Sequence, residues 1–131
     1  NNGIEKTLQT LTTRWFTDEF ININPDLVKR RLKQVVDTDP EVFLNVFKIY
    51  AKTEMLLWLK NISKPCLLLT GENDSGCSPK HNKIMANEIK DFKLVILPKY
   101  KHSLLIEAPN EVAESLIGFI NFTLKADRLR K

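Results

Sequence analysis

The chain has 131 residues, 43% of them hydrophobic and 27% charged, which is typical of one folded domain and excludes a disordered chain. The net charge of +4 raises the question of nucleic acid, but the basic clusters at 29–33 and 128–131 carry no interleaved aromatic residues. No apolar run is long enough to span a bilayer, and no secretory signal pattern opens the chain. We therefore expect neither a nucleic-acid partner nor a membrane span.

Residues 1–62 are predicted to form a helical cap. The first helix follows from apolar side chains at helical spacing: Ile4, Leu8, Leu11 and Trp15. Two further helices start at Asn24-Pro25 and Asp39-Pro40, where a capping residue precedes a proline that suits the first helical position. The helix after Pro40 is expected to bury a stripe of five side chains: Val42, Phe43, Val46, Phe47 and Tyr50. A short helical segment, 53–60, completes this part.

Residues 63–124 alternate between strand and helix, which separates them from the cap. Segments 65–70 and 93–97 are apolar without polar alternation, as strands covered on both faces are. The helix that starts at Ser78-Pro79 lies between them, so a right-handed crossover makes the two strands parallel. Pro109 starts a last helix, and the charged tail, 125–131, is expected to fray.

Two parallel strands do not make a sheet that is stable alone. The pattern therefore predicts an α/β fold with an incomplete sheet. Either another chain supplies the missing strands, or these residues are the second half of a larger fold. An exposed sheet edge would also allow a homodimer in which two copies pair their strands.

One ionisable residue follows each predicted strand. Asp74 comes after segment 65–70, and His102 comes after segment 93–97. Because the carboxyl ends of parallel strands meet at the same edge of a sheet, we expect these two side chains to lie close together. Taken singly, each would be an ordinary loop residue. Together they form two members of a catalytic triad, an acid that orients a general base.

Two segments resemble the α/β-hydrolase superfamily. The turn Gly71-Glu72-Asn73-Asp74 after its strand looks like the acid turn, and His102 followed by Glu107-Ala108-Pro109 looks like the histidine loop. In the helical part, Arg14-Trp15-Phe16-Thr17 and Thr38-Asp39-Pro40-Glu41 are similar to the cap of 3-oxoadipate enol-lactonases and their relatives. The resemblance extends over roughly residues 3–122 and implies the C-terminal part of an α/β-hydrolase fold together with its cap.

This resemblance implies a serine-type hydrolase of a small ester or lactone that needs no cofactor or metal. Asp74 would be the triad acid and His102 the general base. Arg14 would bind a substrate carboxylate, while Trp15 and Phe16 would either line the substrate pocket or pack in the core. No serine here lies in a G-x-S-x-G elbow. We therefore expect a piece of a longer hydrolase, inactive alone, whose nucleophile lies elsewhere.

Other readings stay open from the sequence. Cys66 and Cys77 form no metal-ligand pattern and weakly favour a reducing cytoplasm. Cys77 is not expected to be a nucleophile, because the sequence places no base beside it except His102 at long range. His81 is expected to be a surface residue, and Glu72 and Glu107 to form structural hydrogen bonds. The alternative function is a non-catalytic binding or oligomeric domain with a hydrolase-derived fold.

Overall fold

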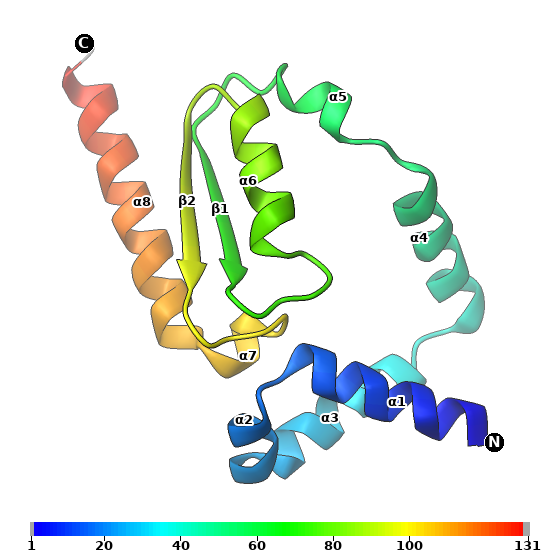
Figure 1. Ribbon diagram of the computed structural model, residues 1–131. Helices are drawn as coiled ribbons and strands as arrows, with labels where there is room; N and C mark the ends of the chain where they lie inside the picture. The colour runs from blue at the N-terminus through cyan, green and yellow to red at the C-terminus, as the bar shows by residue number, and fades with distance from the viewer. Residues whose placement is uncertain (1, 130–131) are drawn as a thin grey trace.

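The computed structural model describes residues 2–129, with the side chains of residues 7–125 (Figure 1). Its elements in chain order are α1 (Asn2–Trp15), α2 (Asp18–Ile23), α3 (Pro25–Val36), α4 (Pro40–Lys52), α5 (Leu56–Leu59), β1 (Cys66–Gly71), α6 (Pro79–Glu88), β2 (Phe92–Leu97), α7 (Leu104–Glu107) and α8 (Pro109–Leu129). The predicted packing of Ile4 and the basic cluster at 128–131 lie outside the described side chains.

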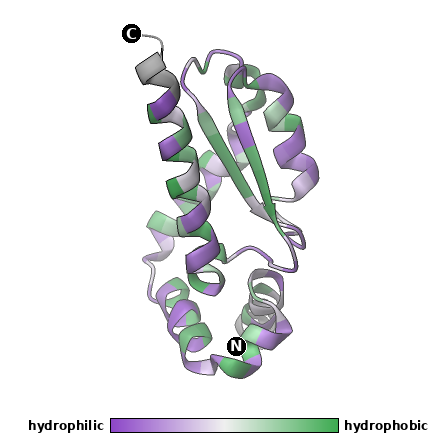
Figure 2. Cartoon of the chain, turned by 90° about the vertical axis from the view of Figure 1, so that its left-hand side faces the viewer, coloured by the Kyte–Doolittle hydropathy of each residue, from purple (hydrophilic) through white to green (hydrophobic). Residues whose placement is uncertain are grey.

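Strands β1 and β2 pair in parallel, from Cys66 opposite Phe92 to Gly71 opposite Leu97. Helix α6 connects them, so the predicted crossover between adjacent parallel strands is confirmed. Within the described residues the sheet has these two strands, as expected for a partial α/β sheet. Apolar residues make up most of both strands, and helices lie against them (Figure 2).

The two faces of the sheet build two separate cores. On one face Leu68 packs with Leu59, Ala86 and Ile89, which come from α5, α6 and the residue that follows α6. The next residue of β1, Leu69, points to the other face and packs against a cluster of Leu97, Leu104, Ala108 and Val112. Because successive strand residues face opposite sides, apolar residues in a row are what such a doubly covered strand requires.

Side-chain caps explain where two of the predicted helices start. Asp39 Oδ1 accepts hydrogen bonds from the backbone N–H groups of Glu41 and Val42 at the start of α4. Ser78 accepts from the N–H of His81 at the start of α6. Asn24 precedes Pro25 of α3 but makes no side-chain capping bond. Two short helices, α2 and α7, were not predicted from the sequence. Helix α2 is capped by Thr17, whose hydroxyl accepts from Phe20 N at 3.2 Å.

Three expectations need correction. Every residue of α4 is exposed, and its expected buried stripe, from Val42 to Tyr50, is 50–73% exposed because no described element covers that face. The segment predicted to be helical at 53–60 is helical only at Leu56–Leu59. The tail expected to fray from residue 125 continues α8 as far as Leu129. Among the described helices, none is long and apolar enough to cross a membrane.

Candidate active site

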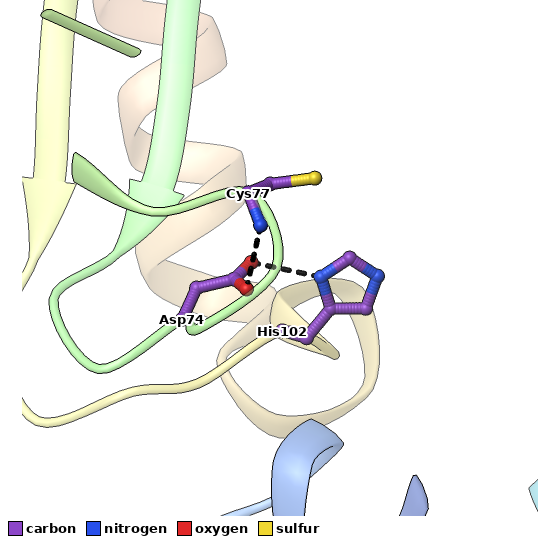
Figure 3. A group of neighbouring side chains, drawn as sticks. All are labelled: Asp74, Cys77 and His102. Atoms are coloured by element: carbon purple, nitrogen blue, oxygen red, sulfur yellow. Dashed lines mark hydrogen bonds and ion pairs between the residues drawn. The ribbon is translucent and has the colours of Figure 1, made fainter. Parts of the chain in front are cut away.

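Asp74 lies in the tight turn that follows β1, and it is only 6% exposed. Its Oδ1 atom accepts hydrogen bonds from the N–H groups of Gly76 (2.8 Å) and Cys77 (2.9 Å), so the turn itself orients the carboxylate. The other oxygen, Oδ2, lies 2.8 Å from Nδ1 of His102 (Figure 3). All the hydrogen bonds of this carboxylate therefore come from groups at the ends of β1 and β2.

His102 is held by its backbone as well as by its ring. The N–H groups of His102 and Ser103 both donate to the carbonyl oxygen of Trp15, at 3.1 and 2.9 Å. The contact with an ionised Asp74 places the ring proton on Nδ1, because a carboxylate only accepts. The neutral ring then has Nε2 as an acceptor, and the side chain is 43% exposed. An oriented, accessible imidazole nitrogen of this kind can accept a proton.

The pKa of Asp74 reflects opposing effects. Burial of the carboxyl raises its pKa, but the hydrogen bond from His102 and those from the N–H groups of Cys77 and Gly76 outweigh burial and bring the pKa below its ordinary value. Asp74 is therefore ionised at neutral pH and can stabilise a positive charge on the ring of His102.

The strand end and the histidine loop approach each other very closely at Gly71. A Cβ atom on this residue would lie 2.2 Å from the carbonyl oxygen of Lys101 and 2.5 Å from that of Tyr100. Such distances leave no room for a side chain, so this position requires glycine. The close approach is what allows Asp74 and His102, 28 residues apart in sequence, to touch.

Two glutamates near the site are structural, as expected. Glu107 accepts a hydrogen bond from the N–H of Thr17 at 3.1 Å and another from the Thr17 hydroxyl, which joins α2 to the end of α7. Glu72 accepts from the N–H of Lys99 at 2.9 Å, in a loop where Lys99 has a positive φ of 65°. His81 is exposed and lies 3.3 Å from Ser78 Oγ, at the start of α6.

The predicted substrate-binding residues take different positions. Arg14 is exposed, and its Nε donates to the Oγ of Ser75, beside Asp74. Trp15 is half-buried, with the guanidinium carbon of Arg31 5.4 Å from the centre of its ring. Phe16 is completely buried and stacks on Phe20, with ring centres 5.3 Å apart. Of the two alternatives for Phe16, the geometry therefore favours core packing.

A cavity of 520 Å³ opens at His102. Its polar lining comes from His102 and Ser103 and from two residues of α3, Arg31 and Gln34. The remaining lining is apolar: Leu69, Leu104, Leu105, Ile106 and Val112. The sequence reasoning missed Arg31, because an arginine in a run of basic residues is indistinguishable from a solvated helix face.

Cys77 lies closer to the histidine than its sequence position indicated. Its Sγ and the ligand atoms of Asp74 and His102 all lie within 4.8 Å of one another, a donor set that could accept a metal ion. However, burial and the charge of Asp74 raise the pKa of the Cys77 thiol. A protonated thiol is a poor ligand and a poor nucleophile, and both oxygens of Asp74 already accept hydrogen bonds. The donor set therefore fits proton transfer better than metal binding.

The chain is similar in sequence to known hydrolases. It is 25% identical over 119 residues to 3-oxoadipate enol-lactonase 1 of Acinetobacter baylyi, an alignment that covers 91% of this chain and 44% of the relative. It is 26% identical over 92 residues to the pimeloyl-[acyl-carrier protein] methyl ester esterase of Nitrosospira multiformis, covering 70% of this chain and 35% of that enzyme. No protein-family model matches the chain.

Among solved structures, the enol-lactonase from Burkholderia xenovorans LB400 superposes with a TM-score of 0.84 at 20% sequence identity. The match covers 91% of this chain and 45% of that one. The chain thus spans less than half the length of the relatives named here, and these relatives are hydrolases.

Proposed function

We propose that this chain, which has the C-terminal part of an α/β-hydrolase fold with similarity to enol-lactonases, supplies the acid and the base of a serine-type hydrolase acting on a small ester or lactone. The observation that carries the proposal is the 2.8 Å contact between Asp74 Oδ2 and His102 Nδ1 at the adjoining ends of two parallel strands. The names of the relatives supply the reaction class.

In this proposal Nε2 of His102 takes the proton from a serine hydroxyl as the serine oxygen attacks the ester or lactone carbonyl. The protonated ring then gives that proton to the departing alkoxide, leaving an acyl-enzyme. Water, deprotonated by the same nitrogen, releases the acid and regenerates the serine. Asp74 holds the ring with Nδ1 protonated and stabilises the imidazolium formed in each half of the reaction.

The serine and the oxyanion hole are proposed to come from polypeptide outside these 131 residues, because none of the serines here lies in a G-x-S-x-G turn. Arg14 and Trp15 are proposed to contact the substrate. The bond from Arg14 Nε to the Oγ of Ser75, one residue from Asp74, supports the proposal for Arg14. The proposal for Trp15 is supported by its carbonyl oxygen, which accepts from the N–H groups of His102 and Ser103.

The test uses the full coding sequence, read upstream of Asn1 for a G-x-S-x-G segment between a strand and a helix. The encoded protein should hydrolyse 4-nitrophenyl butyrate, and the chain of 131 residues alone should not. Asp74→Asn and His102→Ala should each lower kcat by on the order of 10³–10⁴-fold. His81→Ala is the matched control, since that imidazole is exposed and contacts Ser78 Oγ and the Gly76 carbonyl rather than the side chain of Asp74 or His102.

A loss of less than about tenfold in both site variants would reject the triad. It would favour the alternative of a non-catalytic binding or oligomeric domain. Turnover by the 131-residue chain that is abolished in His102→Ala would reject the claim that the nucleophile lies elsewhere.

A further inference from the structure

We propose that Thr70 and Asn82 are positioning residues that fix the turn carrying Asp74, so that this acid holds His102 in the form that can accept a proton. The inference rests on the proposed function, because it takes Asp74 and His102 to be the acid and the base. Among the hydrogen bonds of the described residues, none joins Thr70 or Asn82 directly to either of those side chains. Both act through the backbone that lies between.

The buried polar side chains gather at one place in the described part of the chain. They are those of Thr70, Asp74 and Asn82, which are 2%, 6% and 8% exposed. Burying a polar side chain costs free energy unless hydrogen bonds replace those to water. Because the three belong to one hydrogen-bonded network, the two neutral residues are best explained by what they do for the charged one.

This network meets at the backbone of Cys77. The Thr70 hydroxyl donates to the carbonyl oxygen of Cys77 at 2.6 Å, and Nδ2 of Asn82 donates to the same oxygen at 2.9 Å. The N–H of Cys77 donates in turn to Oδ1 of Asp74 at 2.9 Å (Figure 3). One residue therefore accepts two hydrogen bonds at its carbonyl and gives one to the carboxylate.

The two donors hold the turn from both of its ends. Thr70 is the next-to-last residue of β1, and Asn82 belongs to α6. The amide of Asn82 also donates to the carbonyl oxygen of Ser78 at 3.1 Å, at the residue that caps α6. The turn is thus fixed to the strand before it and to the helix after it. With its N–H donors held in place, the carboxylate keeps Oδ2 directed at the histidine ring, a supporting contact of the kind that precise sites need.

The experiment compares Thr70→Val and Asn82→Leu, which remove the donor and keep most of the side-chain shape, with Thr70→Ser, which keeps the hydroxyl. NMR of the 131-residue chain at about pH 9, where imidazole is neutral, measures the fraction of His102 rings that carry the proton on Nδ1. We expect this fraction to fall in Thr70→Val and Asn82→Leu, because a neutral ring without a firm partner can carry its proton on either nitrogen. Thr70→Ser should behave as the wild type does.

Hydrogen exchange of the Cys77 amide is the second readout. In Thr70→Val and Asn82→Leu this exchange should become about tenfold faster relative to the amide of Val112, a buried residue on the other face of the sheet. A general loss of stability would accelerate both amides alike, so the ratio separates local positioning from folding. In the encoded longer protein, the same two variants should lower kcat on the order of tenfold and leave KM unchanged.

Thr123→Val is the matched control, because the Thr123 hydroxyl also donates to a backbone carbonyl oxygen, that of Phe119 at 2.9 Å, but within α8. This variant should leave all three readouts unchanged. The inference is overturned if Thr70→Val and Asn82→Leu leave the His102 proton and the Cys77 exchange ratio as in the wild type. It is also overturned if Thr123→Val changes them equally, or if Thr70→Ser behaves like Thr70→Val. If the encoded protein hydrolyses no ester, the proposed function fails, while the two NMR readouts still decide this inference.

Discussion

The acid–histidine site and helix α4 differ in what they need from the rest of a protein. Asp74 is a charged group that is 6% exposed, yet its hydrogen bonds all come from nearby turns of this chain. Phe47 is an apolar group that is 56% exposed, and α4 stands apart from the sheet in Figure 1. A polar site needs a few well-directed partners, whereas an apolar stripe needs a whole surface. The described residues supply the hydrogen-bond partners of Asp74, but they supply no surface that covers the apolar stripe of α4.

The largest expected effects come from substitutions that test this contrast directly. Leu68→Ala removes a buried side chain between β1 and α6, and it should lower the free energy of unfolding by about 2–5 kcal/mol. Phe47→Ala should change it by less than about 0.5 kcal/mol, because that ring is already exposed. Urea unfolding of the 131-residue chain measures both. A similar loss in both variants would show that α4 packs on the rest of the chain.

Substitutions at two glycines, one in a tightly packed loop and one in an exposed helix, should change the stability by intermediate amounts. Gly71→Ala forces a Cβ against the backbone of the histidine loop and should cost about 1–3 kcal/mol. It should also perturb the His102 ring signals, because the two loops must separate. Gly118→Ala in the exposed part of α8 meets nothing within 4 Å and should stabilise the chain by about 0.5–1 kcal/mol. Thermal unfolding of both variants tests this, and a tolerated Gly71→Ala would contradict the close approach.

The charge of Asp74 predicts a pH dependence. Its pKa is lower in the folded chain than its ordinary value of 3.8, so the unfolded chain binds the proton more readily. The carboxylate therefore contributes stability above pH 3.8, which is lost as the pH falls through the lower folded pKa. Urea midpoints measured from pH 6 to pH 2 should decline less in Asp74→Asn than in the wild type. Equal declines of the urea midpoint in the two proteins would show that the hydrogen bonds to ionised Asp74 do not stabilise the folded chain.

The smallest effect concerns Tyr100, another polar group served by a nearby partner. Its hydroxyl donates to Glu111 at 2.6 Å, and that hydrogen bond is the main reason its pKa rises to about 12. Stability from this pair is present below pH 10 and is lost as the pH rises through about 12. The phenolate absorbance of the wild type minus that of Tyr100→Phe should therefore develop near pH 12. A difference that develops near pH 10 would contradict the bond.

The site was predictable because its signals are local. An apolar run predicts each strand, and one ionisable residue follows each, so Asp74 and His102 meet once the strands are parallel. The crossover helix was equally clear, since Ser78-Pro79 marks its start. The Asp39-Pro40 pair correctly predicted the start of α4, but the periodicity of its apolar residues did not predict what surrounds the helix. An amphipathic stripe indicates that a face requires cover, and it does not say which residues provide it.

The missed features share a different cause. Helix α2 has only six residues, too few to establish a period, and its one signal is the cap at Thr17. Arg31 is one of several basic residues on α3. It lies over the ring of Trp15 and lines the same cavity as His102 only because of the way α3 packs. Such packing is a tertiary property that no window of sequence contains.

The hydrogen bonds at the carbonyl oxygen of Trp15 limit how α1 and the histidine loop can move. That oxygen receives two N–H groups of the histidine loop, and Lys101 adds a bond from its ammonium to the carbonyl of Thr13 at 2.9 Å. The last turn of α1 and the loop that carries the imidazole are thus held together by three hydrogen bonds. Moving that end of α1 away from the histidine loop would break these bonds and displace the imidazole. A movement that admits a ligand while His102 keeps its position must therefore take place elsewhere in the chain.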